Sequence, residues 1–138
     1  MFARRLCFSP IILLASISAC ASLRASDPQV VRVSVRDSDF KMIGAFDDQR
    51  TMARFRELWL TKRVVAFPST CKLPWAFKID PEPGSRWLYH PAGYMMMLSY
   101  FEEPYFEIPA KEEFNDLLGL ANRNISPLPA ACVPDGRR

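Results

Sequence analysis

The densest group of carboxylates in the sequence lies beside two aromatic residues: Glu102, Glu103, Glu107, Tyr105 and Phe106. A pair of carboxylates can hydrolyse a glycosidic bond when a cleft buries one of them and raises its pKa. Adjacent glutamates in a polar loop are normally solvated, and contact with a protein partner is the next interpretation. The pattern therefore favours a non-enzymatic role and leaves hydrolysis as an alternative.

A histidine and a run of methionines are the other groups that could serve catalysis or metal binding. His90 stands at a predicted turn, and the sequence identifies neither a nucleophile nor an orienting carboxylate for it. The thioethers of Met95, Met96 and Met97 suit Cu(I). Consecutive residues of a strand point to opposite faces, so at most two of these thioethers could share an ion. We predict that the methionines fill the core and that the protein carries no cofactor.

The N-terminal residues have the order of an export signal: a basic start at Arg4 and Arg5, an apolar run at 11–15, and the ending Ile17-Ser18-Ala19-Cys20. This order is typical of a secretory signal peptide. The Ile-Ser-Ala-Cys ending resembles the lipobox of bacterial lipoproteins. The resemblance implies removal of residues 1–19 and lipidation of Cys20 with the several acyl chains that stable anchoring requires. A conventional cleavage after Ala21 is the alternative.

The residue that follows Cys20 bears on sorting. Ala21 stands where an aspartate commonly retains lipoproteins in the inner membrane, so the resemblance implies the outer membrane, with the domain facing the periplasm. Residues 20–28 then form a lipidated tether, and residues 29–138 form a single globular domain. We expect contact with the membrane through the lipid on Cys20.

Removal of the signal also removes most of the net charge. The chain has 18 basic and 15 acidic residues, and loss of Arg4 and Arg5 leaves 16 basic residues against the same 15 acidic ones. A nucleic-acid-binding protein needs a basic face, and this balance does not provide one. We therefore expect no nucleic-acid partner.

Two cysteines remain after removal of Cys7 and lipidation of Cys20, namely Cys71 and Cys132. Disulfides form and persist in an oxidising compartment. A zinc site would need four ligands with close cysteine or histidine pairs, and a cysteine nucleophile would depend on His90, the one histidine. We predict that Cys71 and Cys132 form a disulfide that pins the C-terminal tail, with a reactive thiol or half of a metal site as the alternative.

The hydrophobic periodicity predicts an α+β fold with a small antiparallel sheet and two helices. The expected elements are a strand at about 30–36, a helix at about 48–63, a meander of strands at about 75–108 and a helix at about 110–118. The segment 37–46 is ambiguous and contains a candidate second strand. The end of the meander, between Pro104 and Pro109, is predicted to be an edge strand, because edge strands tolerate proline.

Aromatic residues crowd into the meander, and most of them must belong to the core. Any that lie exposed on one face would form a patch suited to a protein or sugar partner. The predicted partner surface is Trp87, Tyr89, Tyr94, Tyr105, Phe106, Glu102 and Glu103. The sequence thus favours a non-enzymatic lipoprotein that binds another protein in the periplasm, as an envelope accessory subunit or an immunity-type inhibitor. An envelope hydrolase and a small-ligand or metal-binding module are the alternatives.

Overall fold

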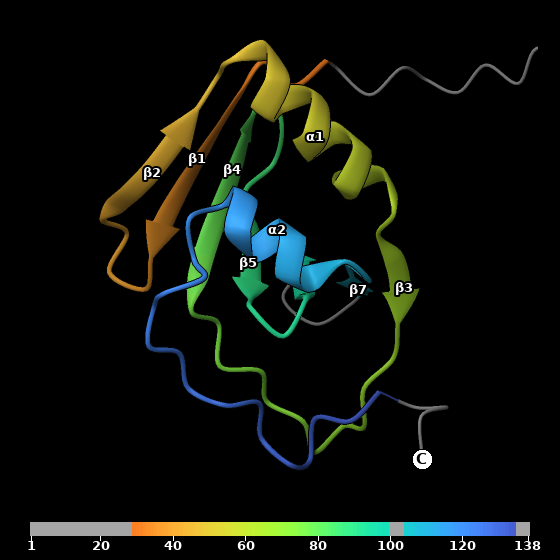
Figure 1. Ribbon diagram of the computed structural model, residues 1–138. Coiled ribbons are helices and arrows are strands. Elements are labelled where there is room, and N and C mark those ends of the chain that lie inside the picture. Colours follow the sequence, from red (N-terminus) through yellow and green to blue (C-terminus); the bar gives the residue numbers. More distant parts are fainter. Residues whose placement is uncertain (1–28, 100–103, 135–138) are drawn as a thin grey trace, which may run out of the picture.

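One antiparallel sheet and two helices make up the fold (Figure 1). The computed structural model describes residues 29–99 and 104–134. In chain order the elements are β1 (Arg32–Asp37), β2 (Met42–Phe46), α1 (Gln49–Leu60), β3 (Arg63–Val65), β4 (Phe77–Glu82), β5 (Trp87–His90), β6 (Tyr94–Met97), β7 (Tyr105–Glu107) and α2 (Lys111–Leu117). The seven strands have the order β2-β1-β4-β5-β6-β7-β3, and all neighbours are antiparallel. The predicted α+β class with a meander is confirmed.

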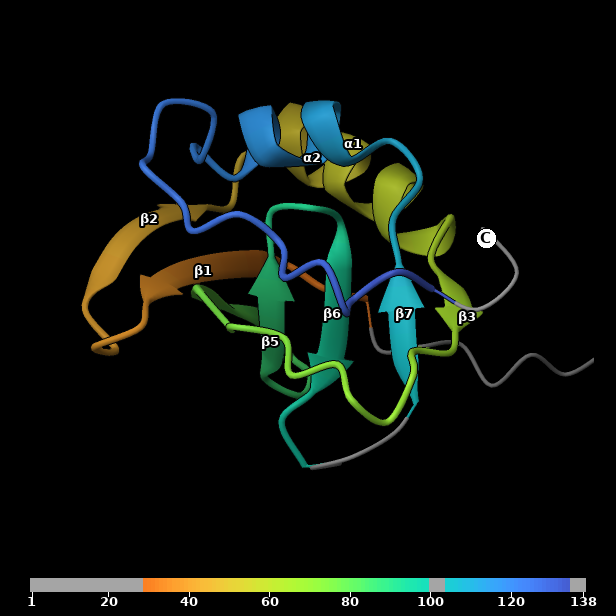
Figure 2. The ribbon, with the colours of Figure 1, turned by 90° about the horizontal axis from the view of Figure 1, so that it is seen from below.

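Both helices cover the same face of the sheet (Figure 2). The helix α1 is amphipathic, because Met52, Phe55 and Leu58 recur at three-residue steps and are buried. Phe55 is fully buried, and its ring lies 5.8 Å from the rings of both Phe46 in β2 and Phe114 in α2. The two helices and the edge of the sheet therefore share one aromatic core.

The register between strands assigns each side chain to one face of the sheet. Tyr89 pairs with Phe77 and with Met95, and all three belong to the core beneath the helices. The next pair along, His90 and Tyr94, points to the opposite face because side chains alternate along a strand. Tyr94 joins a second core that is formed with the loops on that face. The strand β6 is thus a central strand covered on both sides.

The second core contains a disulfide between Cys71 and Cys132, as predicted. It joins the loop before β4 to the C-terminal segment, and Cys132 is fully buried beside Phe67 and Tyr94. The bridge closes a loop with a sequence separation of 61 residues. Such a loop corresponds to a stabilisation of about 4 kcal/mol on the chain-entropy model. The C-terminal segment is therefore held against the sheet.

The end of α1 differs from the prediction, which extended the helix to residue 63. The helix ends at Leu60, where the backbone N–H and the hydroxyl of Thr61 both donate to the carbonyl oxygen of Leu58. The chain then forms β3, which pairs with β7. The prediction that β7 is an edge strand is wrong, because β3 covers it.

The ambiguous segment at 37–46 forms a hairpin from β1 into β2. The carboxylate of Asp37 accepts hydrogen bonds from the backbone N–H groups of Asp39 and Lys41, which stabilise the turn. The buried Lys78 donates from Nζ to the carbonyl oxygens of Asp37 and Ser38. These bonds fix the end of the hairpin against β4.

Candidate functional site

The structure distributes the predicted partner surface over both faces of the sheet. Trp87 and Tyr89 are buried beneath the helices, and Tyr94 is buried in the second core. The register between β5 and β6 pairs Tyr94 with His90, and side chains alternate along a strand. The side chain of Tyr94 therefore points to the face opposite that of Trp87 and Tyr89. The prediction of one exposed aromatic patch is therefore corrected for these three residues.

The remaining aromatic residues of the predicted surface, Tyr105 and Phe106, are partly exposed. Tyr105 is half-buried, with its ring 5.4 Å from Phe67 and 6.2 Å from Trp75. Phe106 is also half-buried and packs against Trp87 at 5.4 Å. Glu102 and Glu103 lie outside the described residues, as does the predicted lipidation site Cys20.

Glu107, the third glutamate of the cluster, joins two strands. Its side chain is buried, and its Oε2 atom accepts hydrogen bonds from Nε and Nη2 of Arg63 at 3.0 and 2.8 Å. Arg63 and Glu107 pair directly across β3 and β7. The carboxylate is therefore engaged within the sheet, and it lines neither of the two cavities described below.

His90 is buried, and backbone groups contact both of its ring nitrogens. The Nδ1 atom accepts a hydrogen bond from the N–H of Ala92 at 3.1 Å. This bond assigns the proton to Nε2, which lies 3.3 Å from the carbonyl oxygen of Ser126 and donates to it. Burial lowers the pKa of His90 below its ordinary value. The neutral imidazole thus holds the C-terminal segment to the end of β5.

Of the three consecutive methionines, Met95 and Met96 are buried and Met97 is half-buried. Within residues 29–99 and 104–134, no three His, Cys, Asp or Glu side chains lie close enough together to hold a metal ion. The two faces of β6 separate Met96 from Met95 and Met97, as the strand geometry requires.

A groove of about 660 Å³ lies where the end of α1 meets the start of β1 and the turn between β4 and β5. This volume is within the range typical of ligand sites. The lining residues come from four segments of the chain that are distant in sequence: Gln29, Val30, Arg56, Trp59, Leu60, Lys62, Pro81, Pro83, Gly84, Ser85, Trp87 and Met97. We call this site the α1–β4 groove.

The aromatic part of the α1–β4 groove is anchored in the core. The ring of Trp59 stacks on Phe55 at 5.0 Å and meets the edge of Trp87 at 5.1 Å. The next residue, Leu60, has 76% of its surface exposed. A rigid indole and a solvated leucine therefore both line the groove.

Two cations of the α1–β4 groove are held in place by the backbone. Nη1 of Arg56 donates to the carbonyl oxygen of Val30 at 3.0 Å. Nζ of Lys62 donates to the carbonyl oxygen of Trp59 and lies 4.6 Å from the centre of the Trp59 ring. Among the described residues that line the groove, none is acidic. The described lining of the groove thus combines apolar and basic residues.

Sequence reasoning did not identify the α1–β4 groove, although one local sign was present. Leu60 lies outside the stripe formed by Met52, Phe55 and Leu58, so a helix over these residues places a leucine away from the core. The remaining lining residues come together only through the fold.

Comparison with known proteins finds no match to a family model, to a curated protein or to a solved structure. Among the described helices, neither has the length and apolar character needed to cross a bilayer.

Proposed function

We propose that this protein is an outer-membrane lipoprotein, anchored through Cys20, whose periplasmic domain binds another protein without catalysing a reaction. Residues 20–28 form its tether, and the bound protein is either an envelope assembly or a toxin that the domain inhibits. The lipobox supports the anchor. The α1–β4 groove supports the binding of a partner.

The exposure of Leu60 beside Trp59 is the observation that carries this proposal. A single exposed leucine is ordinary on a protein surface. A groove that combines an exposed leucine with a fixed indole offers the kind of aromatic and aliphatic contact that a partner protein can bury. Tryptophan is also enriched among the residues that dominate binding energy, because its large rigid ring loses little conformational entropy.

The charges of the α1–β4 groove indicate the chemistry of the partner. Arg56 lies at this partly apolar surface, and none of the described residues that line the groove is acidic. A segment with apolar side chains and nearby acidic residues would complement this surface. We therefore propose an acidic, apolar segment of the partner protein as the occupant.

Site-specific photo-crosslinking in intact envelopes tests this proposal. A photoreactive amino acid replaces Leu60 in one variant and Val64, which is 67% exposed and lies outside the groove, in a control variant. We expect position 60, and not position 64, to give one protein adduct, whose crosslinked segment is acidic and apolar when mapped by mass spectrometry.

The same experiment has two outcomes that contradict the proposal. Adducts with lipid alone at position 60 would assign the groove to the membrane surface. Equal, heterogeneous protein adducts at both positions would show that the groove has no specific partner.

A further inference from the structure

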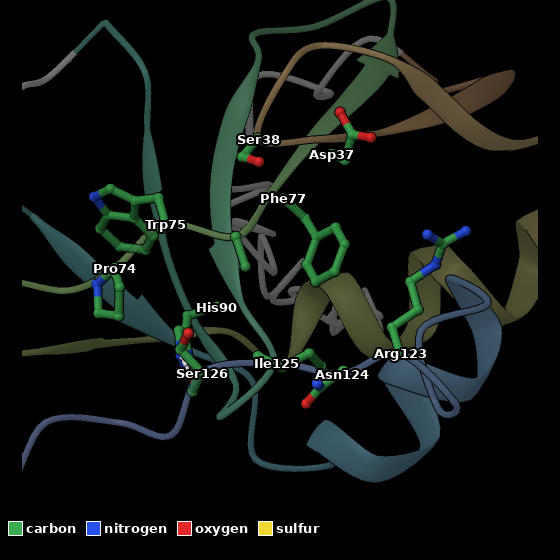
Figure 3. A pocket seen from close by; sticks show the side chains of 11 residues that line it. Asp37, Ser38, Pro74, Trp75, Phe77, His90, Arg123, Asn124, Ile125 and Ser126 are labelled. Atoms are coloured by element: carbon green, nitrogen blue, oxygen red, sulfur yellow. Dashed lines mark hydrogen bonds between the residues drawn. The ribbon is translucent and has the colours of Figure 1, made fainter.

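A second cavity, of about 460 Å³, lies at the end of β4 opposite the α1–β4 groove (Figure 3). Two non-strand segments, 74–76 and 124–126, supply much of its wall. In the close view, Pro74 and Trp75 lie on one side and Arg123 lies on the other. We call this site the loop cavity.

The backbone of both wall segments has unused hydrogen-bonding capacity. Outside the strand ladders, no backbone–backbone hydrogen bond within the described part of the chain involves residues 74–76 or 124–126. The carbonyl oxygen of Ser126 has a partner in the His90 ring. Backbone N–H and C=O groups in folded proteins almost always have partners, and at an open cavity those partners are solvent or a ligand. A ligand with its own backbone could replace that solvent.

The two walls are nevertheless held in position. The disulfide between Cys71 and Cys132 joins the loop that precedes 74–76 to the segment that follows 124–126. The bond from His90 to Ser126 fixes one wall to β5. Binding to walls that are already ordered costs less conformational entropy than binding to loose loops. These contacts favour a preformed site.

The side chains of the loop cavity add one cation and several apolar groups. Arg123 is exposed, and no carboxylate among the described residues pairs with its guanidinium. Asp37 also lines the cavity, but its Oδ1 atom already accepts two N–H groups of the hairpin turn. The apolar members of the lining are Pro74, Trp75, Ala76, Phe77 and Ile125. An arginine at the rim is suited to a carboxylate.

We propose that the loop cavity binds a short extended peptide that carries a carboxylate. The peptide backbone pairs with segments 74–76 and 124–126, as in other sites where a strand is added to open backbone groups. Arg123 binds the carboxylate, which belongs either to the peptide C-terminus or to an acidic side chain. This site is separate from the α1–β4 groove, and the proposal does not rest on the proposed function.

An NMR titration of the full-length protein in mild detergent tests the proposal, because it follows each backbone amide separately. The probes are N-acetyl-tetra-alanine with a free C-terminus, the same peptide as its C-terminal amide, and an amidated peptide with one alanine replaced by aspartate. We expect the amide signals of Trp75, Ala76 and residues 124–126 to shift with the first probe. If the aspartate peptide also shifts these signals, the cavity accepts a side-chain carboxylate. If only the free-acid peptide shifts them, the cavity requires a C-terminal carboxylate.

Two variants identify the role of the cation. Arg123→Gln should weaken binding of the free-acid peptide by about tenfold or more, because a charge-assisted hydrogen bond is lost. Arg50→Gln changes an exposed arginine in α1, outside the loop cavity, and should leave this binding unchanged.

The proposal is overturned if no carboxylate peptide shifts these amides at about 10 mM, a concentration that detects even weak association. Equal affinity of the Arg123→Gln variant and the unaltered protein for the free acid would also overturn it. If the photo-crosslinker at position 60 captures no partner while the loop cavity still binds the peptide, the proposed function is rejected and the proposal for the loop cavity stands.

Discussion

Buried polar side chains in this protein are satisfied by specific partners. The hydroxyl of Tyr89 donates to Oδ1 of Asn115 at 2.7 Å, and Nδ2 of Asn115 donates to the carbonyl oxygen of Pro91 at 2.9 Å. Burial raises the pKa of Tyr89, so its hydroxyl stays protonated and keeps this bond. Across the described residues, no fully buried side-chain nitrogen or oxygen lacks a hydrogen-bond partner. These bonds tie the turn after β5 to α2.

The buried His90 should make stability depend on pH. Burial lowers its pKa in the folded state, so the unfolded chain takes up a proton at a higher pH than the folded protein does. The contribution of His90 to stability is therefore complete above its ordinary pKa of 6.5 and is lost as the pH falls below that value. Protonation of Nδ1 would also break the hydrogen bond that this atom accepts from the N–H of Ala92.

Urea unfolding at pH values between about 7.5 and 5.5 measures this effect. We expect the free energy of unfolding to decrease as the pH is lowered from about 7.5 to about 5.5. The variant His90→Gln has no imidazole to titrate, so its decline should be smaller. Equal declines for the variant and the unaltered protein would show that other groups cause the dependence.

The elements with long, regular patterns could be predicted from the sequence, and the short ones could not. The three-residue steps of α1 and the alternation in β1 and the meander identified most of the fold. The strand β3 has three residues, Arg63–Val65, which is too few to show a period. Its position is determined by pairing with β7, through contacts such as that between Arg63 and Glu107. The sequence therefore predicted the class of fold but not the edge of the sheet.

A turn between two strands depends on one close approach. Gly93 lies between β5 and β6 with a φ of +95°, and a Cβ atom there would lie 2.9 Å from the carbonyl oxygen of Ile108. Gly119 also has a positive φ, of +72°, but a Cβ atom there would meet no atom within 4 Å. A side chain at either glycine would strain the backbone, but only a side chain at Gly93 would also overlap with neighbouring atoms.

The matched substitutions Gly93→Ala and Gly119→Ala measure that difference. Gly119→Ala should lower the free energy of unfolding by about 1 kcal/mol, through backbone conformation alone. Gly93→Ala should cost at least about 1 kcal/mol more, because the methyl group displaces backbone or the Lys111 side chain. Denaturant unfolding gives both values, and equal losses would mean that the turn relaxes without strain.

At the scale of the whole molecule, the candidate sites lie where separate segments meet. The α1–β4 groove combines residues near 30, 59–62 and 81–87, whose proximity depends on the complete sheet order. Sequence reasoning expected a partner surface within one stretch of the meander, and strand alternation instead buried Trp87, Tyr89 and Tyr94. A linear pattern identifies the aromatic residues, but only the register decides which of them reach the surface.

The proposed anchor is a property of the whole protein and is tested by one substitution. Cys20→Ala removes the thiol that would receive the lipid, so the protein should remain an uncut, unlipidated precursor. Labelling with a radioactive fatty acid and fractionation of the envelope measure these outcomes. Normal processing and membrane recovery of the variant would contradict the lipobox assignment.

The most direct test of partner binding compares two matched substitutions at exposed apolar residues. The unaltered protein, Leu60→Asp and Val64→Asp are each crosslinked in intact envelopes and purified, and any bound partner is quantified by mass spectrometry. We expect the unaltered protein and Val64→Asp to retain one partner in near-equal amount. Leu60→Asp should lose about tenfold or more, because it removes the apolar side chain and places a carboxylate against the proposed acidic segment of the partner. Undiminished partner recovery with Leu60→Asp, in a protein with unchanged thermal unfolding, would contradict binding at the α1–β4 groove.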